Sequence, residues 1–484
     1  MRIVLLRVLF LGVCCCSIAA FLHPAARAMP SAPAGRSPVL SRDQQQPHDP
    51  TQVLIRLRPG AVAALPYESE LLIDGWYIVP VLPGETAVAA RQRWLQHPDV
   101  LASELDLVVQ IETSKMAAPA ALKSASDDPY LAWQWHMAAI EAPQAWNRST
   151  GSGVVVAVID SGVSPGPDLA CRTFVAPYNA ITQQEGLPAV ADDNGHGTHV
   201  SGTVAQCTNN GVGGAGVAYD ATIMPIKVCS SSGGCSLADI ARGIDWARLH
   251  GADVINLSLG ADCAGVGNGL WPDCSASVVN QAIEAAIADD ITIVAAAGNA
   301  NQPVVAFPAN HPSVIAVGAI DAANGRAPYS SYGSGLSVMA PGGNLARDDN
   351  SDGVPDGVLQ ETTGTGCSAA EPFVHCLYQG TSMAAPHVAG AVALLRAAYP
   401  QADCTAIQQA LEHTALDLGV TGFDTLHGHG AIQVDAALDA LATMSFGSPP
   451  PAPPTPTATP IAEEDRAMVL DQQRFLPLVT QREP

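Results

Sequence analysis

The sequence predicts an α/β fold in which a mostly parallel central sheet is buried between helices, preceded by a small α+β unit. From about residue 133 to residue 444, short β-branched or apolar runs alternate with helical stretches. The runs are continuously apolar, as in strands that are covered on both faces. Gly and Ala are frequent and aromatic residues make up only 5% of the chain, which suits close packing of helices on strands.

The strands and helices of this sheet follow from the position of each run. Helices are expected at residues 237–250 and 277–289, between successive apolar runs. Such an order, strand then helix then strand, is typical of parallel sheets. The predicted strands are residues 154–159, 222–226, 254–257, 291–296 and 314–317.

The first 28 residues have the features of a secretory signal peptide. Arg2 and Arg7 precede an apolar run, and residues 26–28 (Ala-Arg-Ala) form a small-x-small cleavage motif. The run is too short to span a membrane comfortably. We therefore expect a secreted, extracellular protein with no membrane span. A lipoprotein is the alternative, because residues 11–14 (Leu-Gly-Val-Cys) resemble a poor lipobox.

Composition divides the remaining chain into three parts. Residues 29–126 contain a compact α+β segment at about 50–112, which has an exposed leader before it and an Ala- and Ser-rich linker at 114–126 after it. Within this segment, strands are predicted at 53–57, 76–81 and 108–111, and a helix at 87–96. The other two parts are the large domain, residues 127–445, and a Pro-rich linker and tail, residues 446–484.

The charge of the chain argues against a nucleic-acid partner. The formal net charge is −23, whereas a protein that binds phosphates needs the opposite sign. An acidic extracellular surface accounts for most of this charge. Some of the carboxylates are also candidates for metal ligands.

Cysteine usage is consistent with an oxidising compartment. Of 12 cysteines, the three at 14–16 would leave with the signal peptide, and nine remain. A zinc site is the alternative, but no CxxC pair occurs after residue 28. Sequence alone does not fix connectivity. The expected disulfides are Cys229–Cys235, Cys263–Cys274, Cys367–Cys376 and Cys171–Cys207, with Cys404 left over.

Two residues at the ends of predicted elements are candidates for a charge-relay pair. Asp160 directly follows the strand at 154–159, where ligand sites of α/β sheets form. His196 stands between Gly195 and Gly197 at the start of a helix. A serine nucleophile needs such an imidazole base, oriented by a carboxylate. Each residue alone has a plainer interpretation, a turn or cap aspartate and a loop histidine.

A nucleophile and an oxyanion donor complete the candidate set. Ser382 follows Gly380 at the start of an Ala-rich helix, where backbone N–H groups favour a developing negative charge. Asn299 comes just after the strand at 291–296, so its side-chain amide can face the reacting carbonyl. The plainer interpretations are a helix N-cap serine and a turn asparagine.

The strings around these four residues closely resemble those of the subtilisin-like serine proteases (subtilases). That family has Asp, His in Gly-His-Gly-Thr-His, Asn, and Ser in Gly-Thr-Ser-Met-Ala-x-Pro-His, and this chain shows no departure. The resemblance spans roughly residues 128–443 and implies a subtilisin-like three-layer fold and a serine endopeptidase acting through an acyl-enzyme. Residues 50–112 resemble the family's propeptide, an intramolecular inhibitor and folding assistant, which implies autoprocessing between about 111 and 127.

The resemblance also implies a substrate cleft with small, uncharged walls. Extended peptide would pair with one wall by β-augmentation, while pockets select side chains. These walls imply broad specificity with an apolar P1 preference. The residues carried over are Ser258, Leu259 and Gly260 for one wall of the S1 pocket, Ala296 and Gly298 for the other, and Ala306 for its floor.

Two calcium sites are expected. The loop at 348–357 carries oxygen ligands at alternate positions with a Gly after the third, as in a calcium loop of EF-hand spacing without the closing Glu; Glu361 is near enough to contribute. An acidic surface turn is the alternative. The second site is implied by the resemblance alone. The predicted ligands are Asp348, Asn350, Asp352 and Asp356 for the first, and Asp128, Asp168 and Asn210 for the second.

The sequence therefore predicts a monomeric, secreted, calcium-stabilised endopeptidase that acts on proteins or peptides. An esterase or lipase would need a Gly-x-Ser-x-Gly elbow and the chain order Ser, Asp, His, which this chain lacks. A catalytically dead scaffold is the other alternative. An intact set of four residues behind an inhibitory segment argues against it.

Overall fold

The computed structural model describes residues 47–445, apart from 63–64, 112, 120–126, 264–273, 365–366 and 368–370. The predicted signal peptide and the Pro-rich tail lie outside these residues. Within the described part, no helix is both long and apolar enough to cross a membrane.

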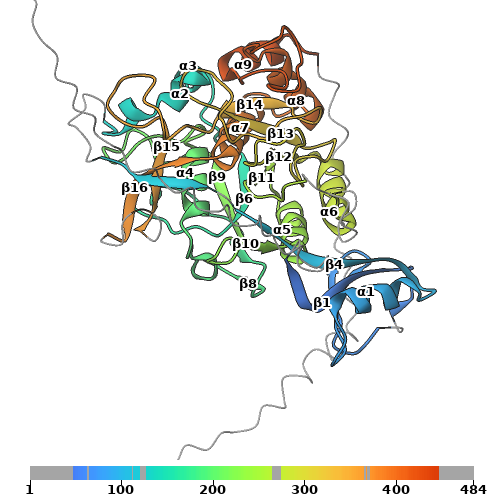
Figure 1. The fold of residues 1–484 in the computed structure, drawn as a ribbon. Helices are drawn as coiled ribbons and strands as arrows, with labels where there is room; N and C mark the ends of the chain where they lie inside the picture. The colour runs from blue at the N-terminus through green and yellow to red at the C-terminus, as the bar shows by residue number, and fades with distance from the viewer. Residues whose placement is uncertain are drawn as a thin grey trace, which may run out of the picture. The chain divides into compact units, whose positions relative to one another are not determined.

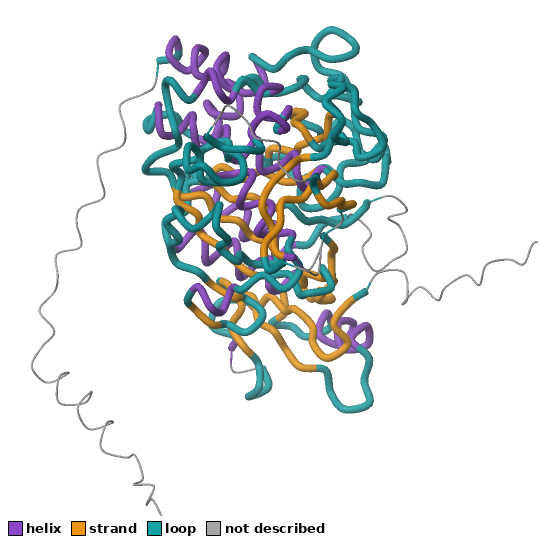
Figure 2. Tube along the Cα trace, turned by 90° about the vertical axis from the view of Figure 1, so that its left-hand side faces the viewer, coloured by secondary structure: helices purple, strands orange, loops and turns teal. Residues whose placement is uncertain are grey.

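The predicted parallel sheet is confirmed and has eight strands in the order β14-β13-β12-β11-β6-β9-β7-β8. All neighbours in it are parallel except β7 and β8. Figure 2 shows these strands running through the interior, with helices around them. The strands are β6 (Val155–Asp160), β7 (Tyr178–Asn179), β8 (Gln184–Glu185), β9 (Thr222–Lys227), β11 (Val254–Leu257), β12 (Thr292–Ala296), β13 (Ile315–Ile320) and β14 (Val338–Pro341).

The sheet separates two hydrophobic cores, because successive side chains of a strand point to opposite faces. In β6, Ala157 and Ile159 belong to one core, whereas Val156 and Val158 belong to the other. The first core is covered by α5 (Leu237–Leu249) and α6 (Ser277–Ala288). The second is covered by α4 (His196–Ala205), α7 (Thr381–Ala398), α8 (Cys404–His413) and α9 (Val434–Thr443). Every strand therefore needs apolar residues at consecutive positions.

Residues 47–111, here called the N-terminal unit, form the predicted small α+β structure. Its helix α1 (Ala87–Leu95) is capped by Thr86, whose hydroxyl accepts a hydrogen bond from the Ala89 N–H at 3.2 Å. Its antiparallel sheet also includes one short strand of the large domain, in the order β10-β4-β1-β3-β2. The strands are β1 (His48–Leu57), β2 (Glu70–Ile73), β3 (Trp76–Pro80), β4 (Val100–Gln110) and β10 (Gly234–Ser236).

The predicted linker at 114–126 is partly wrong. Residues Ser114–Ala117 form a strand, β5, that pairs antiparallel with β16 (Phe373–Gln379), which itself pairs with β15 (Val358–Thr363). All four β5 side chains are exposed, so the segment has no apolar alternation to reveal it. Its pairing depends on the open edge of β16, far along the chain.

Three short helical segments complete the N-terminal part of the large domain, followed by one more before α4. They are η3 (Leu131–Trp133), α2 (Trp135–Ala139), α3 (Ala142–Ala145) and η4 (Leu187–Val190).

The cysteine predictions agree with the structure. Four disulfides form, Cys171–Cys207, Cys229–Cys235, Cys263–Cys274 and Cys367–Cys376. Cys404 is the one free cysteine of the described residues.

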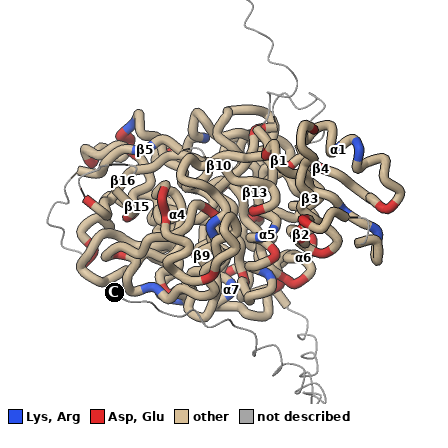
Figure 3. The backbone as a smooth tube through the Cα atoms, turned by 90° about the horizontal axis from the view of Figure 1, so that it is seen from below, with Lys and Arg blue, Asp and Glu red and all other residues tan. Residues whose placement is uncertain are grey.

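Acidic positions are spread over the molecule, both near β15 and β16 and near β2 and α6 (Figure 3).

Candidate active site

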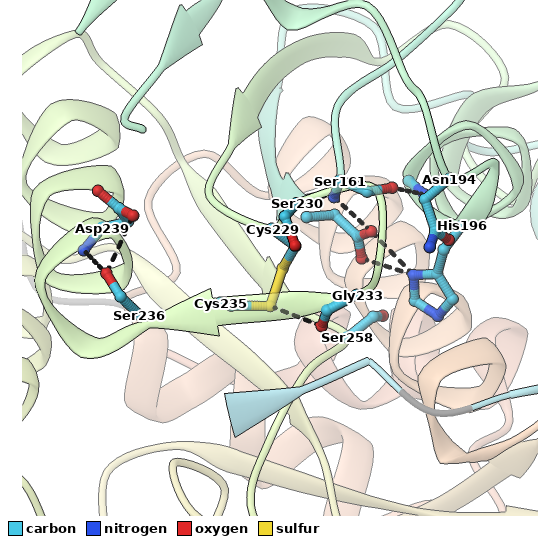
Figure 4. Close-up of a disulfide and its surroundings, with 12 residues drawn as sticks. Ser161, Asn194, His196, Cys229, Ser230, Gly233, Cys235, Ser236, Asp239 and Ser258 are labelled. Atoms are coloured by element: carbon cyan, nitrogen blue, oxygen red, sulfur yellow. Dashed lines mark hydrogen bonds and ion pairs between the residues drawn. A yellow bond between two sulfur atoms is a disulfide. The ribbon is translucent and has the colours of Figure 1, made fainter. Parts of the chain in front are cut away.

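Asp160 and His196 are in direct contact at the carboxyl edge of the sheet. Asp160 is the last residue of β6, and His196 is the first residue of α4. The His196 Nδ1 atom lies 2.8 Å from Asp160 Oδ1 and 2.9 Å from Oδ2 (Figure 4). Both side chains are almost fully buried. Gly197 permits this approach, because a Cβ there would lie 2.2 Å from the Gly162 carbonyl oxygen.

Asp192, which the sequence analysis did not identify, holds the loop before His196. Its Oδ1 accepts hydrogen bonds from the Asn194 and Gly195 N–H groups at 3.0 and 2.9 Å. Its Oδ2 accepts from the N–H and the hydroxyl of Thr198 at 2.9 and 2.6 Å. This carboxylate therefore fixes the start of α4. Its place in the string, four residues before the histidine, was the available signal.

Ser382 lies in the first turn of α7, next to the strand end at Ser258. The Ser382 hydroxyl donates to the Ser258 carbonyl oxygen at 3.1 Å, and the Ser258 hydroxyl donates to the Ser382 carbonyl oxygen at 2.8 Å. Ser258 directly follows β11, the neighbour of β6 in the sheet. Among the described residues, His196 Nε2 is buried and has no hydrogen-bond partner. The Ser382 hydroxyl must therefore turn away from Ser258 before it can reach the imidazole.

The side-chain amide of Asn299 is oriented by Thr381. Its Oδ1 accepts from the Thr381 N–H at 2.8 Å and from the Thr381 hydroxyl at 3.0 Å. The amide's donor end, Nδ2, is therefore directed away from Thr381. Asn299 and Ser382 line the same cavity, so the structure brings these two predicted residues together.

That cavity has a volume of about 250 Å³ and contains five of the six predicted S1 residues. A Cβ on Gly298, whose φ is +105°, would lie 2.9 Å from the Ala306 Cβ; one on Gly260 would lie 2.7 Å from the Phe307 oxygen. Both walls thus depend on glycine. Sequence reasoning missed Asp262, an exposed acidic residue that also lines the cavity. The predicted residues lining it are Leu259, Gly260, Ala296, Gly298 and Ala306.

The N-terminal unit ends inside this cleft. Gln110 exchanges two backbone hydrogen bonds with Gly260, at 3.2 and 3.3 Å, and the Ile111 N–H donates to the Gly233 carbonyl oxygen at 3.0 Å. Two residues later, the Thr113 hydroxyl donates to the Gln379 carbonyl oxygen at 2.7 Å, three positions before Ser382. Gln110, Ile111 and Thr113 therefore contact the same walls of the cleft with which an extended peptide could pair.

The other histidines near the triad candidates are buried parts of the core. Burial lowers the pKa of His199 to about 3 and that of His387 to about 4. His387 Nδ1 lies 2.8 Å from the Met383 carbonyl oxygen, and its Nε2 lies 2.8 Å from His136 Nδ1. His199 Nε2 likewise lies 3.1 Å from the Val358 carbonyl oxygen, so both histidines pack in the core.

The candidate calcium ligands lie together in two separate groups. Asp128 accepts from the Asn209 and Asn210 N–H groups at 2.7 and 3.0 Å, and Asp168 Oδ1 accepts from Asn210 Nδ2 at 2.8 Å. Glu361 belongs to this group and not to the 348–357 loop as expected, because its carboxylate accepts from the Asp168 N–H. Burial raises the pKa of Glu361 to about 7.

The loop at 348–357 folds around its own carboxylates. Asp348 accepts from the Asp352 and Gly353 N–H groups, each at 3.1 Å. Asp356 is 1% exposed, and its Oδ1 has no hydrogen-bond partner in the described structure. Across the described ranges, however, no three His, Cys, Asp or Glu side chains converge closely enough to hold a metal ion as they stand.

Comparison with known proteins agrees with this geometry. The subtilase family, Peptidase_S8, matches residues 151–430. Subtilisin Savinase of Lederbergia lenta is 38% identical over 304 residues, which are 63% of this chain and 97% of that protein. An extracellular protease of Xanthomonas campestris pv. campestris is 36% identical over 357 residues, covering 65% of this chain and 57% of the other.

Two solved structures share the fold. A protease of Pseudoalteromonas arctica aligns with a TM-score of 0.57 and 35% identity, covering 66% of this chain and 99% of that one. Fervidolysin of Fervidobacterium pennivorans, described as a keratinolytic enzyme related to subtilisin, aligns with a TM-score of 0.65 and 28% identity, covering 81% of this chain and 61% of the other. The matched family spans more than half of the chain. The chain therefore belongs to the subtilase family and is a serine endopeptidase.

Proposed function

We propose that Asp160, His196 and Ser382 form the catalytic triad of this endopeptidase. The observation that carries the proposal is the buried Asp160–His196 contact, in which His196 Nε2 has no hydrogen-bond partner among the described residues. Asp160 accepts the Nδ1–H of His196, so the neutral imidazole presents Nε2 as a base. Nε2 takes the Ser382 proton as the hydroxyl oxygen attacks the substrate carbonyl. The proton then passes to the leaving amine, and water hydrolyses the acyl-enzyme by the same route.

Asn299 stabilises the oxyanion formed in each half of the reaction. Thr381 holds its amide oxygen, so Nδ2 is the end that can donate to the negatively charged oxygen. The backbone N–H of Ser382, in the first turn of α7, is the second donor. Donors that are already oriented need no reorganisation when the charge develops.

The cavity beside Ser382 selects the P1 side chain. Its inner wall consists of small residues at 260, 296, 298 and 306, so an apolar P1 residue loses little by desolvation there. Asp262 lies at its exposed part and is the acidic residue among those that line it. We infer broad specificity with an apolar preference at P1.

We infer that the segment from residue 29 to residue 111 or 112 is a propeptide that the enzyme removes itself, so the propeptide ends earlier than the residue 126 expected from the sequence. The N-terminal unit supports this assignment, because its last strand occupies the cleft. Similarity to fervidolysin covers 81% of the chain, more than residues 127–445 comprise, so the likeness extends beyond the large domain. We place the processed bond at one of the two that flank residue 112, because the Ile111 N–H donates to the Gly233 carbonyl oxygen and the Thr113 hydroxyl donates to that of Gln379, three positions before Ser382.

Two carboxylates of the N-terminal unit strengthen its binding to the large domain. Glu104 accepts from the Ser277 N–H at 2.8 Å, at the start of α6, and Asp106 accepts from the Ala238 N–H at 3.0 Å, at the start of α5. Anions at helix N-termini are stabilised by the free N–H groups and the helix dipole. Both carboxylates would be withdrawn when the propeptide leaves.

Residues 1–28 direct secretion, and calcium stabilises the secreted enzyme, which acts as a monomer. The oxygen-only donor set of Asp348, Asn350, Asp352 and Asp356 suits calcium, and the buried, unpartnered Asp356 Oδ1 is a ligand atom without another use. Asp128, Asp168 and Asn210 would hold a second ion. Bound calcium neutralises these carboxylates and stabilises the folded state without taking part in the reaction.

Calcium removal is expected to lower the melting temperature of the mature enzyme. Calcium at a hundred times its dissociation constant stabilises by about 2.7 kcal/mol, which corresponds to about 5 °C here. Thermal unfolding in calcium and in EDTA, with Ser382 blocked to prevent self-digestion, measures the shift. In the Asp356→Asn variant the shift should become smaller. An identical melting temperature with and without calcium would contradict the proposal.

The proposed activity can be tested with a fluorophosphonate probe and a set of peptides. The mature protein should be labelled at Ser382, identified by mass spectrometry of its peptides, whereas heat-unfolded protein should not. Peptides that differ only at P1 should be cleaved faster with Phe or Leu than with Asp or Lys, by about tenfold or more. Folded protein that is neither labelled nor active would refute the assignment of the triad.

A further inference from the structure

In the part of the chain that the structure describes, β10 is an edge strand whose one strand neighbour, β4, belongs to the N-terminal unit. Its residues pair with β4 as Gly234 with Gln110, Cys235 with Val109 and Ser236 with Val108. In the described structure, its one other antiparallel contact is the bridge between Cys235 and Cys229. When β4 leaves, a peptide substrate would have to pair with a strand that has no neighbour in the large domain.

Apart from the disulfide, one side-chain contact among the described residues ties the loop before β10 to the rest of the large domain: Asn194 Nδ2 donates to the Ser231 carbonyl oxygen at 3.0 Å. Residues 230–234 are Ser-Ser-Ser-Gly-Gly, a composition typical of flexible linkers. Two backbone hydrogen bonds, from Ser230 to Gly234 and from Gly233 to Ser230, both 2.9 Å long, close the turn. At the last residue of β10, the Ser236 hydroxyl accepts from the Asp239 N–H at 3.1 Å and caps α5. The far end of β10 is thus anchored by a helix, and the near end by Cys235.

Cys229 in turn is fixed to the proposed triad. Its N–H donates to the Asp160 carbonyl oxygen at 3.1 Å. Its carbonyl oxygen accepts from Lys227 Nζ at 3.1 Å, and the same ammonium group donates to the Ser161 carbonyl oxygen and to Asp193. Figure 4 shows the disulfide between His196 on one side and Ser236 and Asp239, at the start of α5, on the other. Cys229 and Cys235 are both fully buried, which makes the disulfide a structural one.

We propose that the Cys229–Cys235 disulfide determines specificity for extended substrates, by holding β10 at a fixed position relative to Asp160. This inference rests on the proposed function. An edge strand that is already in place does not have to be ordered when the peptide binds, and ordering a few residues costs free energy that would otherwise reduce affinity. Contacts at P1 and the triad do not involve β10, so short substrates gain nothing from the disulfide.

Kinetics of the mature Cys229→Ser/Cys235→Ser variant test this proposal. A tetrapeptide substrate and a single-residue ester with the same P1 side chain are compared. For the tetrapeptide, kcat/KM should fall by about tenfold, mainly through a higher KM. The ester should keep its wild-type kcat/KM, and the rate of fluorophosphonate labelling should not change.

A matched control removes a disulfide elsewhere. The Cys171→Ser/Cys207→Ser variant, assayed in excess calcium, should keep the wild-type ratio of tetrapeptide to ester activity. If the Cys229→Ser/Cys235→Ser variant affects both substrates equally, or affects neither, the proposed role of the disulfide is refuted while the protease assignment stands. Inactive wild-type enzyme would instead refute the proposed function.

The proposal can be tested even if the variant does not mature. The same double substitution is then made in the uncleaved Ser382→Ala precursor, and amide hydrogen exchange is measured by mass spectrometry. Amides of Gly234–Ser236 should exchange about tenfold faster than in the precursor with the disulfide, and those of β6 should not change. If the β10 amides exchange at the same rate with and without the disulfide, the proposed role of the disulfide is wrong.

Discussion

Ser382→Ala is expected to abolish both proteolysis and self-processing, with kcat reduced on the order of a millionfold. The hydroxyl oxygen is the atom that would bond to the substrate, and no neighbouring group replaces it: Ser258 Oγ is committed to the Ser382 carbonyl oxygen. The purified variant should retain residues 47–111, whereas the wild-type product should begin at Glu112 or Thr113. Intact mass and N-terminal sequencing of the secreted forms measure both.

Ser313→Ala is a suitable control for this variant, because Ser313 is exposed and precedes β13, at the amino end of the parallel strands, whereas Asp160 is at the carboxyl end of β6. It should be processed like the wild type. A Ser382→Ala protein that still shortens itself in a preparation free of other proteases would exclude Ser382 as the nucleophile. A new N-terminus that is far from residue 112 would contradict the position of the cleavage site alone.

Asp160→Asn should lower kcat by about ten-thousandfold and leave KM nearly unchanged. The asparagine can fill the same space, but its amide would donate to His196 Nδ1 where the carboxylate accepts. The imidazole would then carry its proton on Nε2 and could not take one from Ser382. Steady-state kinetics on a tetrapeptide separates the two constants. Folding is checked by the melting temperature, which should remain close to that of the wild type.

Asp289→Asn provides the matched control. It removes an exposed carboxylate that pairs with Arg248 at the C-terminal end of α6. Its kcat should equal that of the wild type. A loss in Asp160→Asn that appeared in KM rather than kcat would mean that Asp160 positions substrate and does not orient the base.

The sequence was most informative where local chemistry dictates structure. Asp160 and Asn299 could be placed because each follows a continuous apolar run, and Ser382 because a glycine and an Ala-rich helix surround it. Three of the four disulfides were predicted from short spacing, and Cys171–Cys207, 36 residues apart, was not among them. The same reasoning led to the parallel sheet, since strands buried on both faces have no polar positions to interrupt them.

Features that depend on contacts between distant segments were missed. β5 has exposed side chains and pairs with a strand more than two hundred residues away, so nothing in residues 114–117 indicates it. β10 is three residues long and is completed by β4. Asp192 and Lys227 look like surface residues, yet both stabilise loops beside the proposed triad. Position in three dimensions, rather than residue type, gives them these roles.

The start of α6 has a consequence for how long the mature enzyme lasts. Its N-cap residue, Ala276, has no side chain that can cap it, and Glu104 of the N-terminal unit accepts hydrogen bonds from its first N–H groups. After the proposed cleavage, the large domain would lose the Glu104 carboxylate that stabilises the start of α6. A domain that has already folded need not unfold when this contact is lost. Its durability would then be a matter of rate: a half-life set by the height of the unfolding barrier, with no ready return once that barrier has been crossed.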